Sequence, residues 1–101
     1  MNYLSDLEPQ LSHLMEGSPG RHHHVDTLAE ADMLTFICPV CPSERSHSVG
    51  VFFRDRGVPA EEVPGPGRWE VAGTSLADIT LRPSIVLDCW HGHIINGMVT
   101  P

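Results

Sequence analysis

Cys38-Pro39-Val40-Cys41 and Cys89-Trp90-His91-Gly92-His93 are the stretches that decide the expected fold, because they contain all three cysteines of the 101-residue chain. Zinc takes thiolate and imidazole in tetrahedral sites, and a C-x-x-C turn lets both sulfurs reach one ion. The second stretch adds a third thiolate and nearby imidazoles. The pattern therefore predicts a Zn²⁺ site that joins two distant parts of the chain.

The expected ligands are three thiolates and one imidazole. Side chains on a strand alternate between its two faces, so Cys89, His91 and His93 are expected to share one face. His47 is a further candidate for the imidazole. A histidine that does not bind the ion could orient a ligand through its ring N–H. Buried free thiols are the alternative interpretation of the cysteines, but a metal cage accounts for all of them.

The odd number of cysteines also indicates whether the protein is found in a reducing or an oxidising compartment. A closed disulfide framework would leave one thiol over, whereas three thiolates and a histidine leave none over. We therefore expect reduced cysteines and a cytoplasmic protein. The first residues, Met1-Asn2-Tyr3-Leu4-Ser5-Asp6, have neither a basic region nor a long apolar core, and no apolar run approaches a membrane span.

The charge of the chain restricts its partners. The formal net charge is −7, and three thiolates (−3) around a divalent ion (+2) would make it −8. Such a chain is poorly suited to a phosphate backbone, so nucleic acid is not the expected partner. All six cationic residues are arginine, which excludes chemistry that needs a lysine amine.

Composition and length predict the fold class. Nine glycines and nine prolines among 101 residues favour turns and short strands over long helices. A domain this small is marginally stable without a staple, which a metal would supply. We predict a mainly β, small zinc-stapled antiparallel sheet domain with a short N-terminal helix. Residues 1–20 would form that helix and a linker, and residues 21–101 the zinc-binding β domain.

The helix is predicted from apolar residues at near-helical spacing before Gly17: Leu4, Leu7, Leu11, Leu14 and Met15. Ser5 and Glu8 fit a capping box, and Pro9 is tolerated in a first turn. A second capping box, Thr27 with Glu30, predicts one helical turn over residues 27–32.

Four further segments are predicted as strands from their alternating or extended apolar pattern: 33–38, 47–53, 68–72 and 79–87. Pro83 suits an edge or a bulge in the last of them. Asn96-Gly97 between two apolar arms predicts a hairpin over residues 89–99. Arg21-His22-His23-His24 is expected to be an exposed polar loop, since adjacent histidines point in different directions on a regular backbone.

Six short blocks occur in a specific order: Phe36-x-Cys38-Pro39-x-Cys41, His47-Ser48-Val49, Pro64-Gly65-Pro66-Gly67-Arg68-Trp69, Ile79-Thr80-Leu81-x-Pro83-Ser84-Ile85, Cys89-Trp90-His91-Gly92 and Asn96-Gly97. This order resembles a function-unassigned family of small, predicted metal-binding proteins that occur in phage genomes and in bacterial operons, some near ubiquitin-like conjugation genes. The resemblance covers residues 28–99.

The resemblance implies a zinc-type site and little chemistry. It makes His91 the preferred fourth ligand, because this histidine lies inside a motif block, and His93 and His47 remain alternates. The full expected ligand set is Cys38, Cys41, Cys89 and His91. In the family pattern one more residue often separates the cysteine from the tryptophan-histidine-glycine block, and an aromatic or apolar residue usually takes the place of His93.

Two functions are consistent with these residues. The leading hypothesis is a non-enzymatic structural zinc module that binds another protein, in a phage-host contest, through its acidic surface and the loop over residues 63–67. The alternative is a zinc-dependent hydrolase or deaminase-like enzyme with water in an open coordination position and Asp88 or Glu44 nearby. No glycine-rich phosphate loop, H-E-x-x-H helix or G-x-S-x-G elbow occurs in the chain.

Overall fold

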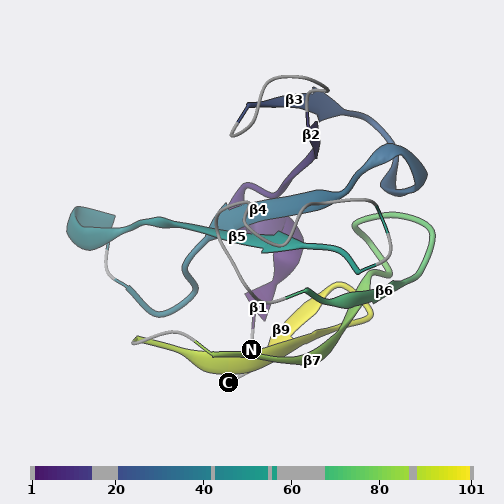
Figure 1. The fold of residues 1–101 in the computed structure, drawn as a ribbon. Coiled ribbons are helices and arrows are strands. Elements are labelled where there is room, and N and C mark those ends of the chain that lie inside the picture. The colour runs from purple at the N-terminus through teal and green to yellow at the C-terminus, as the bar shows by residue number, and fades with distance from the viewer. Residues whose placement is uncertain are drawn as a thin grey trace.

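Two antiparallel sheets form the protein (Figure 1). The computed structural model describes residues 2–14, 21–41, 43–54, 56, 68–86 and 89–100. One sheet has five strands in the order β1-β9-β8-β7-β6, and the other has four in the order β3-β2-β4-β5. The predicted fold class, mainly β with antiparallel sheets, is confirmed.

The five-stranded sheet consists of β1 (Asn2–Tyr3), β6 (Glu70–Ala72), β7 (Thr80–Val86), β8 (His91–Ile95) and β9 (Met98–Thr100). The four-stranded sheet consists of β2 (Gln10–Leu14), β3 (His22–Val25), β4 (Met33–Ile37) and β5 (Ser48–Phe52). Short 3-10 helices are η1 (Leu4–Leu7), η2 (Leu28–Glu30) and η3 (Ser43–Arg45).

The N-terminal helix is shorter than the apolar spacing predicts. It is the four-residue 3-10 helix η1, and the expectation that it continues through Leu14 is wrong. Glu8 ends η1 in the left-handed region at φ 50°, and Pro9 then lacks the N–H that a helix would need. The following residues pair as β2 between β3 and β4. Sheet pairing has thus overridden the helical spacing.

Residues 2–14, which lie within the predicted N-terminal helix and linker over residues 1–20, contribute one strand to each sheet. β1 pairs with β9 through Asn2 opposite Val99, and β2 lies within the four-stranded sheet. The predicted linker over residues 17–20 lies outside the described residues. The histidine tract also differs from expectation, because it forms β3 and not a loop.

Inward-facing residues of the two sheets form one hydrophobic core: Leu11 from β2, Leu34 and Phe36 from β4, Val49 and Val51 from β5, Leu81 and Ile85 from β7, Ile94 from β8 and Val99 from β9. Partners in register meet on this face, as Leu34 meets Val51 and Leu81 meets Ile94. The two sheets form separate layers in Figure 1. Burial between them is the main stabilising term.

The hairpin turn and the Thr27 cap predicted from local sequence patterns are present in the structure. Asn96 and Gly97 join β8 to β9 with φ of 50° and 74°, as the predicted hairpin requires. The pairing of β7 with β8 shifts register between Leu81 and Ile85, around Pro83. Thr27 Oγ1 accepts a 3.3 Å hydrogen bond from the Glu30 N–H and caps η2.

The alternation along β8 gives a direct test of the sheet arrangement. Ile94 is fully buried and Ile95 is 46% exposed, so the two residues are matched in size and differ in burial. We expect Ile94→Ala to lower the free energy of unfolding by about 2–5 kcal/mol. Ile95→Ala should lower it by less than about 1 kcal/mol. Chemical denaturation measures both, and equal losses would contradict the arrangement.

Candidate metal centre

Four donor side chains converge at one end of the sheets: Cys38, Cys41, His47 and Cys89. Their ligand atoms all lie within 4.8 Å of one another. The Cys89 Sγ lies 3.4 Å from both the Cys38 Sγ and the His47 Nε2. In a tetrahedral shell with Zn–S near 2.3 Å and Zn–N near 2.0 Å, two sulfurs lie about 3.8 Å apart, and a sulfur and the nitrogen lie about 3.5 Å apart. The cluster is therefore the right size to hold one metal ion.

Pairing of β4 with β5 places two of the donors side by side. Cys38 directly follows β4 and His47 directly precedes β5, and Ile37 pairs with Ser48 in register. The Cys38 N–H donates a 2.9 Å hydrogen bond to the His47 carbonyl oxygen. The ladder thus continues one step beyond the strands and delivers a thiol and an imidazole to the same place.

Cys89 reaches the cluster from the other sheet. It lies just before Trp90, a residue that is only 5% exposed. The Trp90 ring packs edge-on against Phe36, with ring centroids 6.1 Å apart and planes at 90°. A Cβ on Gly92 would collide with the Thr100 carbonyl oxygen and lie 2.7 Å from the Trp90 ring. Glycine at position 92 therefore allows the indole to lie against β8. The packing of Trp90 on Phe36 therefore keeps the adjacent Cys89 close to Cys38.

The pKa values of Cys38 and Cys89 are shifted in opposite directions. Burial raises the pKa of Cys38, but hydrogen bonds from the backbone of Val40 and Cys41 and from the thiols of Cys89 and Cys41 outweigh it and lower the pKa to about 7. Hydrogen bonds to Cys38 and Cys41, with a smaller contribution from burial, raise the pKa of Cys89 to about 12. Adjacent thiolates repel one another, so ionisation of all three requires a cation among them.

The structure brings together Cys38, Cys41 and Cys89, and His47 completes the group among the described residues. His91 and His93 lie on the exposed face of β8, because Gly92 and Ile94 face inward. The His91 Nε2 lies 3.0 Å from the Ser84 Oγ. Cys89 precedes β8, so the expected convergence of three donors from a single strand is absent from the described part of the chain.

The carboxylates considered for catalysis differ in position. Asp88 lies outside the described residues. Glu44 is exposed on η3, in the loop between Cys41 and His47. All three cysteines are free thiols, so no disulfide competes for the sulfurs of the cluster.

Comparisons with known proteins gave no match: no family model, no curated protein and no solved structure is similar to this chain. The family resemblance of the motif blocks therefore stays a prediction. Within the described ranges, no helix has the length and apolar character needed to span a bilayer.

Trp90 offers a test of how the cluster is positioned. Trp90→Ala removes the ring that packs on Phe36 and should lower the free energy of unfolding by about 3–5 kcal/mol. It should also loosen the position of Cys89 and weaken metal binding. Trp90→Phe keeps an aromatic ring there and should retain most of both properties. Unfolding curves and metal titrations of the two variants check this, and equal metal affinity in both would contradict the positioning role.

Proposed function

We propose that this chain is a small structural zinc-binding domain in which Cys38, Cys41, His47 and Cys89 hold one Zn²⁺. The convergence of four donors within 4.8 Å carries the proposal. Three thiolates and one imidazole form a donor set that suits zinc and is poor for magnesium or calcium. Four protein ligands also leave no place for a reactive water, which is the mark of a structural site.

The ion would act as a staple between the sheets. Cys38, Cys41 and His47 belong to the β4–β5 side, and Cys89 leads into β8 of the five-stranded sheet. A metal bond between these segments closes a long loop that the unfolded chain leaves open. Zinc binding is then part of the folding free energy. In a chain of 101 residues this contribution is large compared with the stability expected from the core alone.

Binding to another protein is the role that we propose for the stapled domain. The net charge of −7 favours a cationic partner surface. Tyr3, Val86 and Ile95 are exposed apolar side chains on strands of the five-stranded sheet, which supports a protein surface as the partner. A role as a phage accessory or host-interaction protein follows from the sequence resemblance alone.

An enzyme is the competing function. His47 and Cys89 are both exposed, so solvent reaches one side of the cluster. In a zinc hydrolase or deaminase-like enzyme, water would replace one of these donors on the ion. A nearby carboxylate would then accept a proton from that water. The number of protein donors on the ion therefore separates the two functions.

Substitution of single donors tests the ligand set. We expect purified protein to contain one zinc per chain, and expect Cys38→Ser, Cys89→Ser or His47→Gln to lose it, because each removes one of the converging donors. His91→Gln and His93→Gln are the matched controls and should keep it, since these side chains lie on the outer face of β8. Elemental analysis gives the zinc content. Loss with His91→Gln and retention with His47→Gln would assign the fourth ligand to His91.

Metal exchange tests whether the shell is closed. Removal of zinc by a chelator should abolish or strongly lower the cooperative thermal transition, and added Zn²⁺ should restore it. The Co²⁺ form should show the visible absorption of a tetrahedral three-sulfur, one-nitrogen site. Azide should leave that spectrum unchanged, because no coordination position is open. A spectrum that shifts with azide, while the Co²⁺ stays bound, would favour the enzyme.

A further inference from the structure

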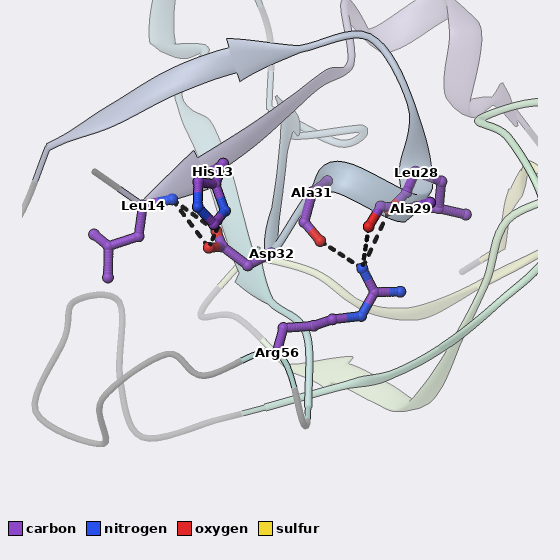
Figure 2. A network of polar contacts seen from close by, with 7 residues as sticks. All are labelled: His13, Leu14, Leu28, Ala29, Ala31, Asp32 and Arg56. Carbon is purple, nitrogen blue, oxygen red and sulfur yellow. Dashed lines mark hydrogen bonds and ion pairs between the residues drawn. The ribbon is translucent and has the colours of Figure 1, made fainter. Parts of the chain in front are cut away.

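A second group of histidines lies on the four-stranded sheet, away from the cysteines, and includes a buried carboxylate. Asp32 has a side chain that is only 4% exposed. Both of its carboxylate oxygens accept hydrogen bonds from the Leu14 N–H, at 3.1 and 3.0 Å, and one lies 3.0 Å from the His13 Nδ1 (Figure 2). The carboxylate is thus held from two sides by β2.

The backbone of Asp32 is held as firmly as its side chain. Its N–H donates to the Ser12 carbonyl oxygen at 2.9 Å, and its own carbonyl oxygen accepts from the Phe53 N–H at 2.9 Å. Arg56 closes the preceding turn, because its Nη1 donates to the carbonyl oxygens of Leu28 and Ala31 at 3.2 and 2.6 Å (Figure 2). The position of the carboxylate is therefore fixed by the fold.

This carboxylate determines which nitrogen of His13 is available. A proton on Nδ1 is shared with Asp32, so the other nitrogen, Nε2, keeps its lone pair in the neutral ring. The His13 side chain is 47% exposed, which gives that lone pair access to solvent. Histidines that bind metals are commonly held in this way, with the second ring nitrogen donating to a carboxylate that raises the basicity of the first.

A second imidazole lies directly across the strand pair. His13 pairs with His23 in the register of β2 and β3, so both side chains project from the same face. Their ring centroids are 5.4 Å apart and their planes are inclined at 75°. Two imidazoles that bind one ion, each with a metal–nitrogen bond of about 2.0–2.1 Å, place their centroids about 4.5–5.2 Å apart at coordination angles of about 90–109°, which is slightly less than the 5.4 Å between His13 and His23. His23 is exposed, so its ring is free to turn a nitrogen toward the His13 Nε2.

We propose that His13 and His23 form a second metal site that binds a divalent transition-metal ion such as Ni²⁺, Cu²⁺ or Zn²⁺, with Asp32 as the residue that positions His13. Imidazole nitrogen is a suitable ligand for all three ions. Two protein donors leave the remaining coordination positions to water or to another ligand, so the site is weaker than the cysteine cluster. The negative charge of the chain further favours a cation at this surface.

The neighbouring histidines, His22 and His24, take no part in this site, because adjacent side chains on a strand point to opposite faces of the sheet. His24 pairs with Ser12 on the opposite face and lies 3.9 Å from Asp26. His22 stacks on Phe52, with ring centroids 5.6 Å apart. The chelating pair is thus formed across two strands and not within the run of three histidines.

The test uses the full-length, zinc-loaded protein titrated with Ni²⁺, with the heat of binding measured by calorimetry. One further equivalent of Ni²⁺ should bind. His13→Gln and His23→Gln should each weaken that binding at least about tenfold, and Asp32→Asn should weaken it by about 10–100-fold because it removes the charge that orients His13. His24→Gln and His91→Gln are matched controls that should bind Ni²⁺ like the parent protein.

Paramagnetic broadening by Ni²⁺ gives the location independently of affinity. The imidazole resonances of His13 and His23 should broaden first, before those of His24 and His91. Equal losses with His24→Gln, or Ni²⁺ binding that survives both His13→Gln and His23→Gln, would overturn the proposal. Zinc content measured on the same samples reports the cysteine cluster separately. If Asp32→Asn fails to fold, the two histidine variants still decide the outcome.

Discussion

Convergence of four donor side chains between the two sheets is the constraint on which the rest of this structure depends. Three thiols and an imidazole lie within 4.8 Å of one another, and repulsion between neighbouring thiolates opposes the ionisation of all three thiols unless a cation lies among them. A divalent ion in the cluster would replace that repulsion with attraction. It would then hold Cys89, which leads into β8, against Cys38, which follows β4.

The packing around the cluster is consistent with this arrangement. Cys38 is buried at the edge of the hydrophobic core, and Trp90 covers the neighbouring Phe36. Gly92 makes room for the indole, so a residue without a side chain contributes to the position of Cys89. The core and the cluster of Cys38, Cys41, His47 and Cys89 therefore share these contacts.

Local patterns predicted much of the sheet architecture. Asn96-Gly97 specifies its hairpin through positive φ at both residues, and the alternation from Val49 to Val51 specifies the inward face of β5. The N-terminal segment differs, since the leucines at positions 4, 7, 11 and 14 have the spacing of a helix, whereas residues 10–14 pair as the strand β2. Its pairing partners β3 and β4 lie later in the chain, and no local pattern identifies them.

Residue types determined the chemistry, whereas the tertiary structure decided the geometry. Three cysteines and seven histidines were enough to predict a metal centre from the sequence, because few other side chains bind soft cations. The choice among the histidines depends on register and face. Pairing of β4 with β5 brings His47 to Cys38, and the inward faces of Gly92 and Ile94 turn His91 outward. Sequence spacing does not identify the partners of strands that lie far apart in the chain, because their pairing is a long-range property of the folded chain.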